Sequence, residues 1–371
     1  MLDHARLLSR FKVWQRMIPD LAVSKSNLIK LMVLLAISVF LISCETIGYY
    51  GQATRGQLAI LFGREDIQHL LSDTETSEKL RGKFIEVLQI RKFAANDLDL
   101  PVANNYSTYV DVNREHVVWN VFAAPEFSTD PVNWCYPIAG CVAYRGYFNE
   151  AGALHYAAQL EDEGFDVYTG GVDAYSTLGW FDDSLLSTVM SRANYQLAGL
   201  IIHELAHQIA YLPGNTTFNE SFATAVEREG LRRWLQATNR ANTIAIAERD
   251  RSRQQKFIDL VMEFRDQFTE LYELELSEAR KREEKTGLQN RLREEYENLK
   301  ASWDGYGGYD SWFSRSLNNA QLSTVGSYND YVPFFNNLLE QVDGVMPDFY
   351  AEVQRIVALS EEERNFLLEN Y

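Results

Sequence analysis

The chain has 371 residues, of which 46% are hydrophobic and 13% aromatic, and its formal net charge at pH 7 is −17. This composition excludes an intrinsically disordered chain and provides enough apolar material for one large domain or two moderate ones. The acidic surface repels phosphate backbones, so we expect no nucleic acid partner.

The N-terminal segment has the pattern of an export signal. An apolar run of about a dozen residues follows Lys30 and ends at Cys44, which is too short to span a bilayer as a helix but suits the centre of a signal peptide. The letters LISC at its end resemble a bacterial lipobox. We therefore interpret residues 1–43 as a lipoprotein signal peptide and Cys44 as the site of lipidation. The alternative is a buried core helix that ends in a cysteine.

A lipidated N-terminus predicts a protein that its acyl chains anchor in the cell envelope and that faces the periplasm. Glu45 follows the cysteine, and by the sorting pattern of enterobacterial lipoproteins a residue other than aspartate favours the outer membrane. Residues 44–106 are then expected to form a lipid-anchored tether and N-terminal helices. The letters TSEKLRGKFIEVLQIRKFA predict one of these helices over 76–94.

The character of the chain changes at residue 107, where β-branched and aromatic residues become frequent. We expect a small mixed sheet with helices beside it, because predicted strands surround an amphipathic helix that runs from Asn149 to Glu163. The predicted strands are STYVDV (107–112), HVVWNVFAA (116–124), CVAYRGYF (141–148) and FDVYTGG (165–171).

Cys135 and Cys141 lie close together in the letters NWCYPIAGCVAYRGYF, with a proline and a glycine between them. In an exported protein this spacing favours a small disulfide-closed loop. The alternative is a cysteine metal site, which needs further ligands nearby, and none is evident in the surrounding sequence.

The letters STVMSRANYQLAGLIIHELAHQIAYL predict a long helix over 187–212 that ends before a Pro-Gly pair, and a second helix starts near Phe218 and runs towards Trp234. His203 and His207 are four residues apart, so on a helix their rings project from one face and can converge on one ion. Glu204 points beside that ion, where a base can take a proton from an activated water. The alternative is an ordinary amphipathic helix with two core histidines.

Two histidines supply only half of a tetrahedral site, and a catalytic zinc site has three protein ligands plus water. Glu220 lies in the opening turn of the second helix, and a turn at Pro213-Gly214 would fold it back towards the histidines. The alternative for Glu220 is a carboxylate that stabilises the N-terminus of its helix. Glu227, two turns further on the same face, is the fallback third ligand or an acceptor for a ligand histidine.

Residues 241–371 are expected to be a helical region. Two sets of apolar residues recur at heptad spacing and predict an antiparallel helical hairpin whose turn lies between 274 and 287. We expect the two stripes to face each other as core rather than to form a membrane or partner surface. From Tyr306 onward we expect aromatic loops and two helices. The stripes are Phe257, Val261, Phe264, Phe268 and Leu271, and Leu288, Leu292, Tyr296, Leu299 and Trp303.

The letters HELAHQ followed by NESFAT resemble the gluzincin metallopeptidases, although the gap between them is shorter than in those enzymes. Nearly everything after Cys44 resembles the bacterial putative aminopeptidase lipoprotein family, through segments such as IGYYGQATRGQLAIL, VVWNVFAAPEFS, VYTGGVDAYSTLGWFDD and WFSRSLNNAQL. The resemblance implies an α+β, predominantly helical fold with a zincin-like catalytic core over 107–240 and a small mixed sheet, plus the long C-terminal helical hairpin.

The resemblance also implies a zinc peptidase that hydrolyses peptide or protein substrates, with His203, His207 and Glu220 as Zn²⁺ ligands and Glu204 as the general base. Tyr175 and Tyr328 are candidates for the group that stabilises the oxyanion, although either is more often a packing tyrosine. The choice between exopeptidase and endopeptidase action stays open. The alternative from another class is a non-catalytic, zinc-stabilised envelope lipoprotein that acts as a scaffold or binds a partner.

Overall fold

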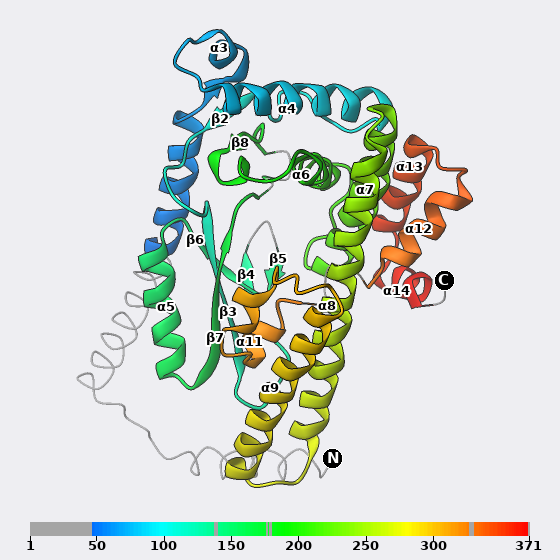
Figure 1. Cartoon of the computed structure of the whole chain (residues 1–371). Coiled ribbons are helices and arrows are strands. Elements are labelled where there is room, and N and C mark those ends of the chain that lie inside the picture. Colours follow the sequence, from blue (N-terminus) through cyan, green and yellow to red (C-terminus); the bar gives the residue numbers. More distant parts are fainter. Residues whose placement is uncertain (1–46, 137–139, 176, 178–179, 326–329, 370–371) are drawn as a thin grey trace, which may run out of the picture. The chain divides into compact units, whose positions relative to one another are not determined.

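The computed structural model describes residues 47–136, 140–175, 177, 180–325 and 330–369 (Figure 1). Residues 55–371 form one compact unit, and in the segment before it residues 47–54 are helical. The described residues are 60% helix and 10% strand, which agrees with the expected α+β class and its predominantly helical content. The expected signal peptide and Cys44 lie outside the described residues, and the expected domain boundaries after residues 43, 106 and 240 stay predictions.

The strands of the described residues are divided among three small sheets, where the sequence suggested one. In the first sheet β3 pairs antiparallel with β6 on one side and with β7 on the other, and β4 and β5 form a separate antiparallel pair. The remaining sheet is mixed, because β2 pairs antiparallel with β1 and parallel with β8. The strands are β1 (Glu65–Asp66), β2 (Thr108–Val110), β3 (Val118–Pro125), β4 (Trp134–Tyr136), β5 (Gly140–Val142), β6 (Arg145–Tyr147), β7 (Phe165–Val172) and β8 (Leu185–Leu186).

The single strand predicted over 141–148 is wrong in extent. Its first part belongs to β5, which pairs with β4, whereas its second part is β6, which pairs with β3. The residues between them leave the ladder because the chain changes its pairing partner there. A sequence pattern reports that residues suit a pleated surface, but it does not report which strand they pair with.

The helix α5 (Glu150–Asp162) confirms the amphipathic helix expected at this place. Its buried residues, Ala153, Ala157 and Leu160, recur at the spacing of one helical face. Asn149 caps its N-terminus, because the side-chain oxygen accepts a hydrogen bond of 2.6 Å from the backbone nitrogen of Gly152. Packing of α5 on β3 and β7 covers one side of the first sheet (Figure 1).

The main core is built around α6 and α7. Its fully buried side chains include Phe84, Ile202, Phe222, Phe335 and Phe349. These residues come from five separate helices, which is why this core holds the two central helices firmly. The contributing helices are α4 (Glu78–Asp97), α6 (Asn194–Ala206), α7 (Thr216–Ala237), α12 (Val332–Gln341) and α13 (Met346–Val357). The shorter helices are α3 (Ile67–Ser72), η1 (Ser187–Val189), α10 (Asp310–Phe313), α11 (Asn319–Leu322) and α14 (Glu361–Glu369).

The long helix predicted over 187–212 is wrong at both ends. The 3-10 turn η1 occupies its start, and α6 begins only at Asn194. At the other end the chain leaves the helix after Ala206, and the backbone nitrogen of Ile209 bonds to the carbonyl oxygen of Ala206 in a tighter turn, at 2.9 Å. The second predicted helix is confirmed as α7, with about one additional turn in all, divided between its two ends.

The predicted helical hairpin is confirmed. It consists of α8 (Ala241–Glu273) and α9 (Glu278–Ala301), which lie side by side, and the turn falls inside the expected interval (Figure 1). The two stripes pack against each other in one apolar cluster. Lys285 ties the hairpin to the first sheet, because its buried ammonium group lies 2.6 Å from Asp166 on β7. After Tyr306 the described residues contain five helices, α10 to α14, where two were expected.

Across the described residues, the helices lack the combination of length and apolar character that crossing a bilayer requires.

Candidate metal centre

Three of the side chains that the sequence singled out come together where α6 meets α7. The carboxylate oxygen Oε2 of Glu220 lies 3.2 Å from Nε2 of His203 and 3.8 Å from Nε2 of His207. One donor atom from each residue lies within 4.8 Å of the other two. His207 is buried, and the other two side chains are only 15% and 19% exposed.

The donor atoms fit the spacing that a single metal ion requires. Ligands about 2.0–2.1 Å from a tetrahedral ion are roughly 3.3–3.4 Å apart. The distances from Glu220 to the two rings bracket this value. The Nδ1 atom of His207 is buried without a hydrogen-bond partner among the described residues. Two imidazoles and one carboxylate could therefore hold a metal ion with small movements of their side chains.

The turn between the two helices sets the position of Glu220. Asn219 is 3% exposed, and its amide group bonds twice to the backbone of Leu212, at 2.7 Å to the nitrogen and 2.9 Å to the carbonyl oxygen. Asn215 caps α7 by accepting a hydrogen bond of 2.9 Å from the backbone nitrogen of Phe218. Sequence reasoning missed Asn219, although it directly precedes the predicted ligand. Its two bonds hold the start of α7 against the turn that follows α6.

Glu227 lies on the other side of the His203 ring from Glu220. Its Oε2 atom is 3.1 Å from Nδ1 of His203. Gly199 makes this approach possible, because a Cβ atom at that position would lie 2.9 Å from Oε1 of Glu227. A carboxylate that accepts from one nitrogen of a histidine orients the ring and frees the other nitrogen for a metal. Glu227 was predicted as either a third ligand or an acceptor for a ligand histidine, and this geometry corresponds to the acceptor.

The charges at the site are strongly coupled. Burial acts to lower the pKa of His203, but its hydrogen bonds to Glu220 and Glu227 outweigh burial and raise this pKa well above the ordinary value. Burial and the neighbouring charge of His203 lower the pKa of His207 to about 4. Burial acts to raise the pKa of Glu220, but the hydrogen bond from His203 holds it below its usual range. Without a metal ion, the two carboxylates therefore favour the protonated form of His203.

Glu204 differs from the other carboxylates of the site. Its side chain is partly buried, and among the described residues it has no hydrogen-bond or ion-pair partner. Burial, opposed by His203 and assisted by the carboxylates of Glu220 and Asp183, raises the pKa of Glu204 to about 7. A carboxylate with such a pKa can accept and donate a proton near neutral pH. Perturbed groups of this kind occur often at functional sites.

The remaining predicted residues lie elsewhere. The hydroxyl of Tyr175 donates to Gln57, and its ring packs against Phe148, which corresponds to the packing role. Tyr328 lies outside the described residues. Among the other histidines, His116 bonds to Asp173 at 2.7 Å and not to a residue of this site.

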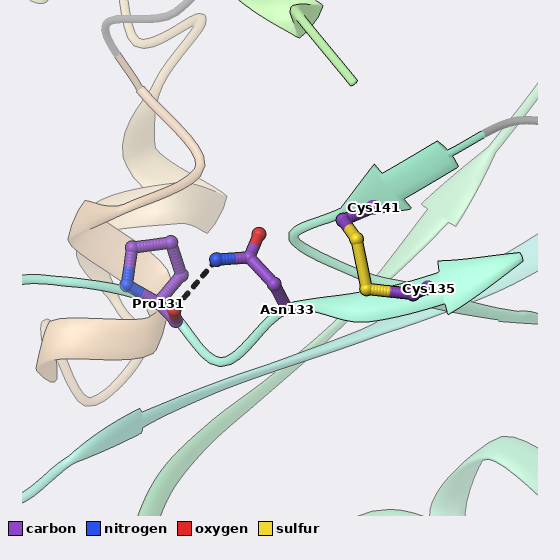
Figure 2. Close-up of a disulfide and its surroundings, with 4 residues drawn as sticks. All are labelled: Pro131, Asn133, Cys135 and Cys141. Atoms are coloured by element: carbon purple, nitrogen blue, oxygen red, sulfur yellow. Dashed lines mark hydrogen bonds between the residues drawn. A yellow bond between two sulfur atoms is a disulfide. The ribbon is translucent and has the colours of Figure 1, made fainter. Parts of the chain in front are cut away.

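Cys135 and Cys141 form a disulfide between β4 and β5, with their Cα atoms 3.8 Å apart (Figure 2). Gly140, the first residue of β5, packs against the turn between α6 and α7. At Gly140 a Cβ atom would lie 2.9 Å from the backbone nitrogen of Gly214. Only a residue without a side chain fits there, and the positive φ of Gly140, 75°, also favours glycine. Sequence reasoning did not anticipate this contact, because it joins segments that are far apart in the chain.

A family model described as "Putative aminopeptidase" matches residues 48–368. No curated protein and no solved structure matches the chain significantly.

Proposed function

The chain belongs to the putative aminopeptidase family, and from this premise we propose that it is a zinc-dependent peptidase that a lipid anchors to the cell envelope. The observation that carries the proposal is the convergence of His203, His207 and Glu220 within 4.8 Å of one another. Two neutral imidazoles and one carboxylate are a common ligand set of catalytic zinc sites, which leave the fourth position open.

Zinc, when bound, would supply a Lewis acid that polarises a peptide carbonyl and lowers the pKa of water. The role proposed for His203, His207 and Glu220 is to hold the ion. The role of Glu227 is to keep the His203 ring in the orientation that directs Nε2 towards it.

Glu204 is the proposed general base. It would accept a proton from the attacking water and deliver it to the nitrogen of the leaving amine, so that one carboxyl group completes both transfers. Its lack of a bound partner in the described structure supports this role, because a carboxylate engaged in an ion pair would not be free to take the proton. Its pKa of about 7 lies close to the pH at which such an exchange is most efficient.

The first experiment measures metal and hydrolysis in matched variants. We expect about one zinc per chain in the purified protein, and we expect its loss in His203→Ala but not in His155→Ala, a histidine exposed on α5. Glu204→Gln should retain zinc and lose about 10²–10⁴-fold in hydrolysis of a peptide library. Normal zinc content in His203→Ala, or undiminished hydrolysis by Glu204→Gln, would contradict the assignment. The positions of cleavage in the library would distinguish exopeptidase from endopeptidase action.

The lipid anchor at Cys44 and the periplasmic face of the outer membrane are also part of the proposal. The apolar run that ends at Cys44 supports them. The disulfide between Cys135 and Cys141 is in keeping with an oxidising compartment. We expect labelled palmitate to be incorporated into the protein in cells. Cys44→Ser should abolish both this incorporation and the attachment to the membrane. A Cys44→Ser protein that stays in the membrane fraction would argue against the anchor.

The scaffold alternative requires a closed zinc site, which usually has four protein ligands and often cysteines. Cys135 and Cys141 could serve in this way only as free thiols, and the disulfide uses both. Thiol titration of the exported protein separates the two functions. No free thiol is expected for the peptidase, whereas two free thiols would favour the scaffold.

A further inference from the structure

Residues 55–62 form the last part of the helix that Figure 1 draws in blue before α3. One side of this helix packs on the compact unit. Ile60 is 6% exposed and belongs to a buried apolar cluster. The side chain of Gln57 accepts a hydrogen bond from the hydroxyl of Tyr175. These contacts hold one side of the helix against the rest of the unit.

The opposite side of the same helix is apolar and exposed. Leu58 is 42% exposed and Phe62 is 84% exposed. The two are four residues apart, so they lie on one face, and a helical turn of 3.6 residues places this face away from Ile60. A surface helix usually directs its polar residues outward, whereas a helix that is apolar on all sides is usually covered. The exposed face therefore suggests a second contact.

The charge of this segment differs from that of the whole protein. The chain has a formal net charge of −17, but residues 46–64 contain neither aspartate nor glutamate. Their charged residues are Arg55, which is exposed, and Arg64, which bonds to Ser184 at 3.0 Å. An anionic surface, which most of this acidic protein would repel, can therefore approach the exposed face.

The length of the chain before the helix decides which surface is within reach. Ile47, the first described residue, is helical and 69% exposed, and Cys44 lies three residues before it. Three residues span at most about 10–11 Å even when they are fully extended. With acyl chains on Cys44, Ile47 must lie within about this distance of the lipid. A second copy of the protein is not held so close by any covalent connection.

We propose that this helix docks on the membrane surface, with Leu58 and Phe62 inserted among the lipid headgroups and Arg55 next to their phosphate groups. The inference rests on the proposed lipid anchor and adds to it, because acyl chains alone leave a protein free to turn on its tether. Amphipathic helices of this kind lie in the plane of the membrane, with the apolar face about 5–10 Å deep. Docking would give the compact unit one orientation relative to the bilayer.

The test uses the complete protein as cells process it, reconstituted in vesicles of phosphatidylethanolamine and phosphatidylglycerol. Leu58→Cys and Phe62→Cys each introduce one thiol for a nitroxide spin label. No other thiol competes for the label, because the disulfide uses Cys135 and Cys141 and acylation uses Cys44. Both replaced side chains are exposed, so the fold should persist, and thermal denaturation checks this.

Electron paramagnetic resonance measures how often each label collides with oxygen, which concentrates among acyl chains, and with a nickel complex that stays in water. We expect the ratio of oxygen to nickel accessibility to be at least about 10-fold higher at positions 58 and 62 than in the control Val345→Cys. Val345 is 44% exposed in the turn between α12 and α13, which Figure 1 shows on the other side of α7 from residues 55–62.

Three results would each overturn the docking. Labels at 58 and 62 that meet nickel as often as the label at 345 would mean that the helix stays in water. Labels that meet neither reagent would mean that protein, such as a second copy of the chain, covers the face. Mass spectrometry of the same preparation counts the acyl chains, and their absence would refute the anchor together with the docking. Acylated protein with a water-exposed helix would refute the docking alone and leave the anchor standing.

Discussion

The α6–α7 pair and the α8–α9 pair both bring two helices into close contact, yet they bury different kinds of side chain. Between α8 and α9 the contact is made of apolar and aromatic side chains such as Phe268 and Leu292. Between α6 and α7 two histidines and the carboxylates of Glu220 and Glu227 are held among apolar residues. Burial of apolar surface stabilises a fold by about 25 cal/mol per Å², whereas buried charges stabilise it only when their pairing is good.

The difference shows where stability and chemistry are located in this protein. The charged groups at α6–α7 are kept in place by each other and by apolar side chains from surrounding helices, so that this region depends on the rest of the core. The α8–α9 stripes are typical of a helical hairpin and require no ion. Substitutions in the two regions should therefore separate folding from metal binding.

The largest expected effect is on folding. Phe268 is fully buried in the α8–α9 cluster, so Phe268→Ala should reduce the free energy of unfolding by about 3–5 kcal/mol. Urea denaturation measures this change. Leu274→Ala, at an exposed position at the end of α8, should change it by less than about 0.5 kcal/mol. Metal content at low temperature should be the same in both variants, and selective loss of metal from folded Phe268→Ala would remove the distinction between the regions.

The second-largest effect is expected when His203 loses the carboxylate that accepts a hydrogen bond from its Nδ1 atom. Glu227→Gln removes the carboxylate that lies 3.1 Å from Nδ1 and should weaken zinc binding by about 10–100-fold. Competition with a fluorescent chelator measures the affinity. The paired control is Glu278→Gln on α9, an exposed glutamate. Equal zinc affinity in wild type and Glu227→Gln would mean that the ring needs no acceptor.

The pH dependence of metal binding provides a third comparison. Because the pKa of His203 is raised in the metal-free protein, its proton must leave when the ion binds. Zinc affinity should therefore rise by up to about tenfold per pH unit from pH 6 towards the pKa of His203 and level off above it. Deprotonation of Glu204, whose pKa is about 7, acts in the same direction. Titration in buffers of different ionisation enthalpy counts the released protons, and a pH-independent affinity would contradict a protonated His203.

The smallest effect is expected when a single methyl group is added at Gly199. Gly199→Ala would place a Cβ atom 2.9 Å from Glu227, and the carboxylate has to shift, so zinc affinity should fall only a few-fold. The same change favours the helix by about 0.8–1.0 kcal/mol, because alanine has the higher helix propensity. Gly287→Ala on α9 is the matched control, since its Cβ atom would meet nothing within 4 Å. It should stabilise the protein without any change in zinc affinity, and identical zinc affinities for both variants would show that Gly199 has no role at the site.

Much of the helical part of the fold could be predicted from the sequence. The apolar stripes of the hairpin, the helix from Glu150 and the second helix of the metal centre follow from periodicity within one segment. The strand over 141–148 and the helix over 187–212 were predicted with the wrong extents. In the first place the chain changes its pairing partner, and in the second it leaves the helix after Ala206 through a tighter turn.

What the sequence by itself determined about the site is the pairing of His203 with His207, because a separation of four residues places two side chains on one face of any helix. It also indicated Glu220 as the third donor. Only the tertiary structure decided that Glu227 bonds to the opposite nitrogen of His203 and that Gly199 makes room for it. The physical reason is that local geometry depends on neighbouring residues, whereas these contacts depend on how distant helices pack against each other.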